Sequence, residues 1–539
     1  MIALLTRRAL LAYARRPLNL VLLVVVPVVL VVVWAGTLAD FSELLGGVGD
    51  RTQIEAATAG WAAAAVAGLA GFFQVSGSRA ADRRLAAAGR STAVVTARLG
   101  SSLTLALLAS AGGLLALAAS EGIKGPGRAI TVTVLFAVIY LALGIVVGTF
   151  VRSEMNGALL VTLAWVFDVF FGPGMGAGSI GVTRLFPLHF PTLVMTSQAS
   201  GHAGPIGDLG WSLSWAVGLS ILAVARLVTD LRPTRPPSRT LPLRAPVKPT
   251  PTITRKILPA PGPRRNPVAP AAPAARARDN CAGGEPVTGK DRLAAGLRAG
   301  LREHRRNVVL WVVLVVVPVV FIALAIAVTP DTLGPVTLVE GSRRYPEMVS
   351  MRRAHAATMV PVTSAFLAGL TGLFVVTGSQ GGDRRLVLAG YQTREVLAAR
   401  LGVIGAATVL TTAVAVAVSS AWYSPNQWAG FTAANILVAL TYAMIGVLLG
   451  PQVGRLGGLY LVLLLAFIDV GLGQTIMLGD GPPTWGAYLP ARGPSRMLID
   501  SAFTNQFDEW PYLLLGLAWL FALTAAASLA FDRRSGARR

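Results

Sequence analysis

Long apolar runs alternate with short polar stretches along the whole chain, and this pattern predicts the secondary structure. Twelve runs are close to the roughly 20 residues that a helix needs to cross the hydrocarbon core of a bilayer. Within lipid, only a helix or a closed barrel satisfies every backbone N–H and C=O group. The predicted spans lie near residues 18–36, 57–76, 100–120, 130–150, 156–173, 210–228, 308–329, 356–376, 402–421, 431–450, 457–474 and 510–530.

The composition agrees with this pattern, because 54% of the residues are apolar and only 13% are charged. Soluble domains carry roughly 25% charged residues. The sequence therefore predicts an all-α polytopic membrane protein. The first apolar run follows Arg15 and Arg16 and could be taken for a secretory signal, but a matching run follows Arg305 and Arg306 in mid-chain, where no signal is cleaved. We expect the first helix to remain as an anchor.

The polar segments between spans contain an internal duplication. Residues 82–100 read DRRLAAAGRSTAVVTARLG and residues 383–402 read DRRLVLAGYQTREVLAARLG, and both lie between a second and a third apolar run. We therefore predict two homologous six-helix halves, residues 1–229 and 291–539, joined by a linker at 230–290. Six spans return the chain to its starting side, so the halves should be related by an axis along the membrane normal.

The orientation follows from the distribution of basic residues. Lys and Arg gather in the N-terminal arm, both repeated segments, the linker and the tail, whereas Asp40, Glu43, Asp50 and Glu55 crowd the loop after the first span. Basic loops stay in the cytoplasm. Both termini are therefore expected to be cytoplasmic, in a multi-pass protein of the plasma (inner) membrane.

The net charge of +22 comes largely from the region around the linker, where residues 226–306 hold 18 Lys and Arg against 5 Asp and Glu. Residues 233–273 hold 13 of the 33 prolines, which predicts an extended, flexible linker. Anionic membrane lipids are suitable partners for such basic segments. Because no aromatic residues or binding motif accompany the charge, no nucleic-acid partner is expected. The only cysteine, Cys281, lies here, so no intrachain disulfide can form.

A phosphate-loop pattern in the linker is interpreted as a chance match. Gly284, Gly289 and Lys290 fit G-x-x-x-x-G-K, but Asp291 occupies the position of the magnesium-binding Ser or Thr. No apolar strand precedes the pattern either. The chain is therefore expected to bind no nucleotide or other cofactor of its own.

The repeated segment is the main functional candidate. Asp82 and Asp383 begin a short helical pattern that contains a glycine and ends in A-R-L-G. An acidic start and a basic end complement the helix dipole, so we predict a short cytoplasmic helix between spans two and three. The alternative is a loop whose arginines only fix topology. Topology requires positive charge, but it requires neither the order D-R-R-L nor the glycine, and both recur.

Three further features accompany the repeated segment: a basic interfacial helix before the first span of each half, a very short link between spans four and five, and a proline-containing outer segment before span six. With these features the chain resembles a type-2 ABC-transporter permease with two fused six-span subunits. The resemblance implies a transport subunit that is not itself an enzyme. Two copies of a separate ATPase subunit would bind ATP and Mg²⁺ below it, and coupling helices would dock into their grooves. These helices fall on Asp82, Arg83, Arg84, Leu85 and Gly89, and on Asp383, Arg384, Arg385, Leu386 and Gly390.

Two outer segments, residues 186–197 and 489–500, precede the last span of each half. The resemblance implies that they form re-entrant hairpins at the exit side, and a plain exterior loop is the alternative. Irregular backbone at membrane depth is tolerated only where protein or water covers it. Each segment carries two prolines four residues apart: Pro187, Pro191, Pro490 and Pro494.

Two acidic residues, Asp168 and Asp469, lie at matching positions late in the fifth spans. A carboxylate within lipid costs about 2.5–3.5 kcal/mol, so each should face the bundle interior or water. Lining the transport pathway and capping the outer hairpin are both open roles. The four histidines show no ligand spacing, and no metal site is expected: His189, His202, His304 and His355.

The sequence thus favours the permease subunit of an ABC exporter that moves a hydrophobic or amphiphilic small molecule, as in antibiotic efflux. A proton-coupled transporter of the major-facilitator type is one alternative. Its loop signature places three residues between Gly and Asp, whereas four separate Gly77 from Asp82 and Gly378 from Asp383. A non-transporting membrane scaffold is the other alternative.

Overall fold

The computed structural model of the chain describes residues 2–15, 17–120, 122–176, 181–231, 289–306, 308–340, 343–477 and 482–536. Most of the predicted linker lies outside the described residues, and so do Cys281 and Gly284.

Ten helices of the described part are long and apolar enough to cross a membrane, so the protein is a helical multi-pass membrane protein. Each coincides with a predicted span. They belong to α2 (Pro17–Leu45), α3 (Arg51–Ser76), α5 (Ser91–Ser120), α6 (Pro126–Phe150), α9 (Gly207–Asp230), α12 (Val308–Val328), α13 (Met351–Leu388), α14 (Thr393–Ser419), α15 (Trp428–Ala466) and α17 (Trp510–Gly536).

The predicted fifth span of each half falls on a shorter apolar helix. In the first half this helix is α7 (Glu154–Phe170). In the second half, α15 bends at Gly454, whose φ is 74°, and continues into an apolar stretch that ends in the π-helix η6 (Phe467–Gly473). A left-handed residue of this kind is normally glycine, because it has no Cβ to clash.

Shorter elements complete the chain. Two amphipathic helices, α1 (Ile2–Ala14) and α11 (Gly289–Arg306), precede α2 and α12 as expected. The others are α4 (Arg79–Leu85), η1 (Ala86–Arg90), η2 (Pro173–Met175), η4 (Gly181–Leu185), α8 (His189–Met195), η5 (Gly204–Ile206), η7 (Thr484–Tyr488) and α16 (Arg492–Phe503).

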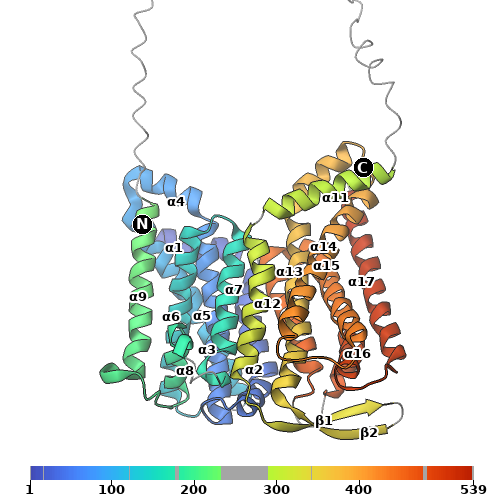
Figure 1. Cartoon of the computed structure of the whole chain (residues 1–539). Helices are drawn as coiled ribbons and strands as arrows, with labels where there is room; N and C mark the ends of the chain where they lie inside the picture. Colours follow the sequence, from blue (N-terminus) through green and yellow to red (C-terminus); the bar gives the residue numbers. More distant parts are fainter. Residues whose placement is uncertain are drawn as a thin grey trace, which may run out of the picture.

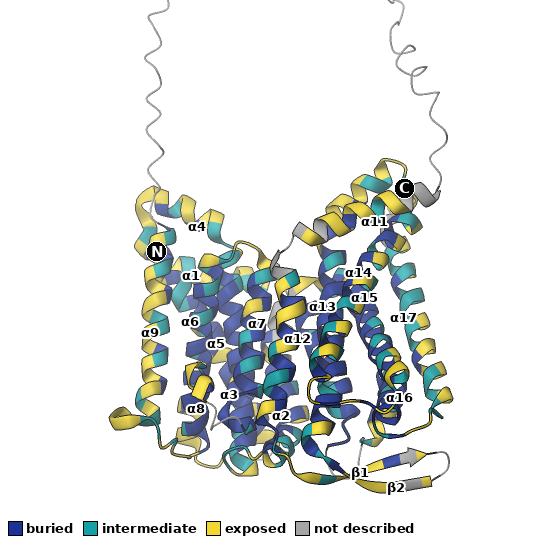
Figure 2. Cartoon of the chain, viewed as in Figure 1, coloured by how far each residue is buried: buried dark blue, intermediate teal, exposed yellow. Residues whose placement is uncertain are grey.

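The core is built around α3 and α13, whose apolar stretches are mostly buried, whereas α9 and α17 are mostly exposed at the periphery (Figure 2). α3 packs against α2, α5 and α6, and α13 packs against α12, α14 and α15. Small residues permit the closest contacts. A Cβ added at Gly144 would lie 1.9 Å from the carbonyl oxygen of Gly68, and one at Gly446 would lie 2.0 Å from that of Gly369. Glycine at such contacts lets helix backbones approach within a membrane.

The molecule has two distinct ends (Figure 1). Both marked chain termini, α1, α4 and α11 lie at one end, which we call the motif end because it carries the repeated segments. The outer-segment helices α8 and α16 lie at the opposite end together with a β-hairpin, and we call this the hairpin end.

The β-hairpin adds two strands to the predicted all-α fold. β1 (Leu333–Glu340) pairs antiparallel with β2 (Arg343–Ser350), with Leu333 opposite Ser350. The side chains of Val336 and Leu338 are buried in a cluster that includes Ile476, Met477 and Ile499, and Phe41 and Leu44 at the end of α2 pack against the same cluster. The hairpin therefore contacts helices from both sequence halves.

Candidate functional site

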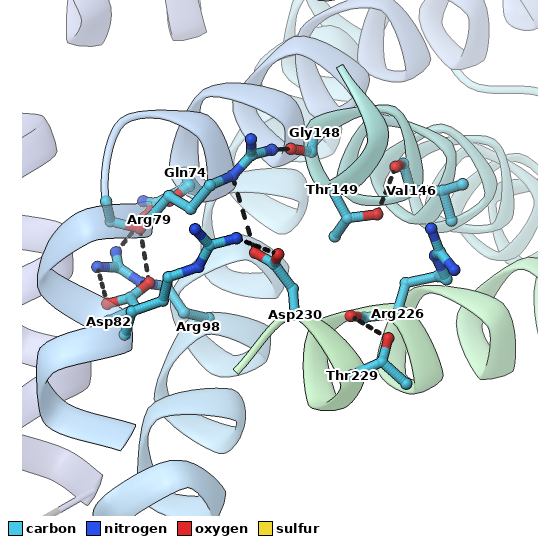
Figure 3. A network of polar contacts seen from close by, with 12 residues as sticks. Gln74, Arg79, Asp82, Arg98, Val146, Gly148, Thr149, Arg226, Thr229 and Asp230 are labelled. Carbon is cyan, nitrogen blue, oxygen red and sulfur yellow. Dashed lines mark hydrogen bonds and ion pairs between the residues drawn. The ribbon is translucent and has the colours of Figure 1, made fainter. Parts of the chain in front are cut away.

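The first repeated segment folds into α4 and a tight turn, which bring its two ends together. The turn contains Gly89, whose φ of 78° is left-handed. After the turn, Arg98 in α5 reaches back to Asp82: its Nε and Nη2 donate to the two carboxylate oxygens, each at 2.8 Å (Figure 3). Ser78 Oγ donates to Asp82 Oδ2 at 2.7 Å, and Arg98 Nη1 donates to Gln74 Oε1 at 3.0 Å. A two-bond arginine–carboxylate pair fixes orientation as well as distance.

The second repeated segment makes the same pair in a different helical context. Arg400 Nε and Nη2 donate to Asp383 Oδ1 at 3.0 and 2.8 Å, and Ser379 Oγ donates to Oδ2 at 2.6 Å. Here the prediction of a separate short helix is wrong, because α13 runs without a break to Leu388. The left-handed turn follows at Gly390, whose φ is 94°. We call Asp82–Arg98 and Asp383–Arg400 the two clasps.

The clasps are largely shielded from solvent. The side chains of Asp82 and Arg98 are 10% and 18% exposed, and those of Asp383 and Arg400 are 7% and 13% exposed. Sequence reasoning gave the aspartates a role at the helix start and missed their pairing with the arginines of A-R-L-G. The recurrence of both ends of the motif, at similar separation, was the signal that could have revealed it.

The other predicted coupling residues lie around the clasps in the same order in both segments. The two arginines after each aspartate are exposed, the leucine is half-buried and the glycine is exposed: Arg83, Arg84, Leu85 and Gly89, and Arg384, Arg385, Leu386 and Gly390. Each segment therefore presents an exposed basic face while its aspartate points inward.

The first segment also forms ion pairs with α9. Arg83 Nη2 lies 2.6 Å from Asp230 Oδ1 at the end of α9, and Arg79 Nε lies 3.8 Å from Asp230 Oδ2. Arg79 also donates to the backbone oxygen of Gly148 in α6 (Figure 3). Arg79 corresponds to Gln380 in the second segment, so this particular ion pair belongs to the first segment alone.

The buried acidic residues Asp168 and Asp469 hold the outer segments in place. Asp168 accepts from the hydroxyl of Tyr140 at 2.5 Å and from the backbone N–H of Leu188 at 3.0 Å. Asp469 accepts at Oδ2 from the hydroxyl of Tyr442 at 2.9 Å and from the backbone N–H of Ala491 at 2.8 Å.

Leu188 and Ala491 are the N-cap residues of α8 and α16, where unpaired backbone N–H groups and the helix dipole favour a carboxylate. Of the two open roles for these acids, the contacts are those of a polar cap for the outer segment.

The four prolines of the outer segments flank these caps. Pro187 and Pro490 immediately precede the N-cap residues and are half-buried, whereas Pro191 and Pro494 lie in the first turn of α8 and α16 and are buried. Proline is tolerated in a first helical turn because no backbone N–H is needed there. Both segments are short helices packed against spans, since α8 contacts α9 and α6, and α16 contacts α15 and α17.

Two histidines that the sequence pattern leaves scattered lie together at the hairpin end. The Nε2 atoms of His189 and His202 are 3.3 Å apart. Burial, with His202 and Arg184 nearby, lowers the pKa of His189 to about 4, so this imidazole is neutral at physiological pH. Across the described ranges, no group of three or more His, Cys, Asp or Glu side chains is arranged to hold a metal ion.

A cavity of about 890 Å³ opens at the motif end. Its lining comes from both sequence halves: α1, the end of α3, α4 and α5 on one side, and α13 and the bend of α15 on the other. Both members of the first clasp line it. Pockets that bind drug-sized molecules commonly have volumes of about 300–1,000 Å³, so the cavity is large enough for a small-molecule substrate.

Toward the hairpin end, aromatic side chains fill the contact between α2, α7, α12 and the end of α15. The rings of Phe170 and Phe467 stack at 4.9 Å between centroids, and Phe171 packs edge-on against Phe321 at 5.1 Å. Trp34 of α2 packs against Phe467 at 5.8 Å. A small cavity of about 50 Å³ lies among these residues.

No protein-family model matches the chain, and no curated protein matches it significantly. The functional assignment therefore depends on the geometry of the motif end, the clasps and the cavity.

Proposed function

We propose that the chain is the transmembrane subunit of an ABC exporter, with twelve spans in two homologous six-span halves and both termini in the cytoplasm. It would move a hydrophobic or amphiphilic compound across the plasma membrane. Two separate ATPase subunits would bind ATP and Mg²⁺ and dock at the motif end.

The two clasps carry this proposal. Each joins the segment after a second span to the start of the third span through a shielded arginine–carboxylate pair. A loop that only sets topology needs no such pair. A segment that transmits force from an ATPase must be rigid and fixed to its span, and a two-bond ion pair supplies both properties. Arg83 pairs with Asp230, and the other exposed arginines beside the aspartates, Arg84, Arg384 and Arg385, leave a basic surface for docking.

The contacts between sequence halves support two related units. α2 of the first half contacts α15 of the second, and Trp34 of α2 packs against Phe467 just after the last part of α15. α12 of the second half contacts α7 of the first. α2 and α12 are the predicted first spans of their halves, and the predicted fifth spans lie in α7 and the last part of α15. The first span of each half thus meets the fifth of the other, as expected for two units related by a two-fold axis.

The cavity and the aromatic contact suggest how transport would proceed. A pathway open at the motif end and closed toward the hairpin end describes an inward-facing state. When the ATPases close on bound ATP, the repeated segments would move with them, and the clasps would pass this movement to α5 and α14. The aromatic contact between Phe170, Phe467 and their neighbours would then separate and release the substrate outward.

Inside-out membrane vesicles provide the deciding experiment. The chain would be expressed with the ATPase encoded next to it, and uptake of a hydrophobic dye would be followed with and without ATP. We expect uptake that needs ATP, is blocked by vanadate and survives a protonophore, and we expect the ATPase to copurify with the chain. Uptake abolished by the protonophore alone would favour a proton-coupled transporter. A complete lack of uptake and copurification would favour a scaffold.

A further inference from the structure

We infer that the cavity at the motif end binds the anionic head group of an amphiphile, held between Arg8 of α1 and Arg455 of α15. The inference deepens the proposed function and rests on it, because it names the substrate class of the same pathway. The two arginines belong to different sequence halves, yet both line one cavity.

The charges around the cavity favour an anion. Five charged side chains line it: Arg8, Asp82, Arg98, Glu154 and Arg455. Asp82 and Arg98 neutralise each other in the first clasp. Among the described residues, neither Arg8 nor Arg455 has an ion-pair partner within 4.0 Å. Within the described part of the chain, the guanidinium group of Arg455 makes one long hydrogen bond, 3.4 Å, to the backbone oxygen of Thr377.

Apart from Asp82, Glu154 is the acidic side chain in the cavity lining. Its position at the start of a helix already stabilises part of its negative charge. It lies in the first turn of α7, where the positive end of the helix dipole stabilises a carboxylate. Two cations thus remain for a ligand against one partly compensated anion. Guanidinium groups bind carboxylates, phosphates and sulfates through paired hydrogen bonds.

The local backbone directs Arg455 to this position. Gly454 has a φ of 74° and a ψ of −175°, which bends α15 directly before Arg455. No heavy atom lies within 4 Å of a Cβ added at Gly454, so the glycine is required by backbone conformation and not by lack of space. The bend places an arginine at the cavity in a region where a straight helix would have continued.

Part of the remaining lining is apolar, beside the polar side chains of Gln74, Ser78, Thr377 and Gln380, and this apolar part can hold an apolar tail on the ligand. Leu5 and Tyr13 of α1, Phe73 of α3 and Val94 of α5 all face the cavity. α1 is the amphipathic helix expected at the membrane surface. Head group and tail would therefore meet the cavity at the level of the cytoplasmic leaflet. A membrane phospholipid and a dissolved amphiphile share this chemistry.

Binding to the purified chain tests the inference without any ATPase. The chain would be placed in phosphatidylcholine nanodiscs and titrated with a dansylated undecanoic acid, and with its uncharged methyl ester, after subtraction of protein-free discs. We expect the acid to bind about a hundredfold more tightly than the ester, which is the discrimination that two charge-assisted hydrogen bonds supply, one from each arginine. Equal affinity for acid and ester would overturn the inference.

Matched variants localise the effect. Arg8→Gln and Arg455→Gln should each weaken binding of the acid by about tenfold and leave binding of the ester unchanged. Arg152→Gln is the control, because Arg152 is exposed nearby but does not line the cavity. Glu154→Gln should strengthen binding of the acid, an outcome that a folding defect cannot imitate. If Arg455→Gln binds the acid as the wild type does, the inference fails.

Competition between an anionic membrane lipid and the probe distinguishes the two sources of the amphiphile. Nanodiscs that contain phosphatidylglycerol should displace the probe if a membrane lipid occupies the site, and should leave the probe bound if the site takes dissolved amphiphiles. Either result supports an anionic-amphiphile site. Charge-selective binding without any copurified ATPase or ATP-dependent uptake would refute the proposed function and leave the binding site intact.

Discussion

Replacing Arg98 with Lys tests whether the repeated segment needs the geometry of the clasp or only a positive charge that fixes topology. The charge is kept and the geometry is lost. Arg98 donates through two nitrogens to Asp82 and through a third to Gln74. A lysine ammonium is a compact charge on a flexible stem and cannot reproduce this planar fork. Arg98→Lys should therefore insert normally but hold the repeated segment loosely.

The size of the effect follows from the lost bonds. Hydrogen bonds to charged groups contribute about 1.5–3 kcal/mol each. The pair is partly exposed, with 18% of the arginine side chain and 10% of the aspartate side chain accessible, so solvent screening reduces the loss. We expect a loss of about 1–2 kcal/mol, which corresponds to roughly a 5- to 30-fold change in the closed-to-open ratio of the clasp.

Two measurements check this prediction. The first is the thermal unfolding midpoint of the purified complex, and the second is the amount of substrate transported per ATP hydrolysed in vesicles. Arg98→Lys should lower both, and Arg400→Lys should do the same through the second clasp. The control is Arg90→Lys on the neighbouring turn, since Arg90 is exposed. If Arg98→Lys behaves like Arg90→Lys in both measurements, charge alone suffices and the repeated segment is a topogenic loop.

Three further predictions concern the turns, the acid caps and pH. Gly89→Ala should lower the unfolding midpoint more than Gly89→Asn, because φ is 78° and nothing crowds the Cβ, and asparagine tolerates a left-handed backbone better than alanine. Tyr140→Phe should cost about 1–3 kcal/mol in thermal stability and more than Tyr442→Phe, because among the described residues Asp168 keeps one other donor, whereas Asp469 keeps two, Ala491 and Gln474. Burial raises the pKa of Asp500 from 3.8 to about 6, so its contribution favours folding at low pH and is lost as pH rises through 6. Asp500→Asn should flatten this part of the pH–stability profile, and an unchanged profile would contradict the assignment.

The sequence predicts the elements whose signals are local. Span positions, the interfacial helices and a helical D-R-R-L segment follow from apolar length and periodicity, and the ten long apolar helices agree with them. Side-chain pairs such as Asp82–Arg98 are 16 residues apart, so they depend on how the chain turns at Gly89 and not on a period. For the same reason the sequence does not predict the hydrogen bond between Asp168 and the backbone of Leu188, which joins residues 20 apart.

The β-hairpin was missed although a signal for it exists. Gly341 and Ser342 separate two short segments of strand-forming residues, a spacing typical of a two-residue hairpin turn. Pro335 and Pro346 argue against strands in general, but proline is accepted where no neighbouring strand needs the N–H. Each strand of a two-stranded hairpin has a single neighbour, so alternate N–H groups point away from the ladder and proline can occupy those positions.

The differences between the two repeats fit a protein with two docking sites and one pathway. Both repeats keep the aspartate, the serine before it, the arginine of the clasp and the left-handed glycine, and these positions would each serve their own ATPase. The repeats differ where a single structure serves the whole molecule. The hairpin follows α12, whereas α2 is followed directly by α3. The cavity takes an arginine from the bend of α15 but a glutamate from the start of α7. Because one substrate would meet both halves at once, its site needs no symmetry, and divergence there gives the cavity its positive charge.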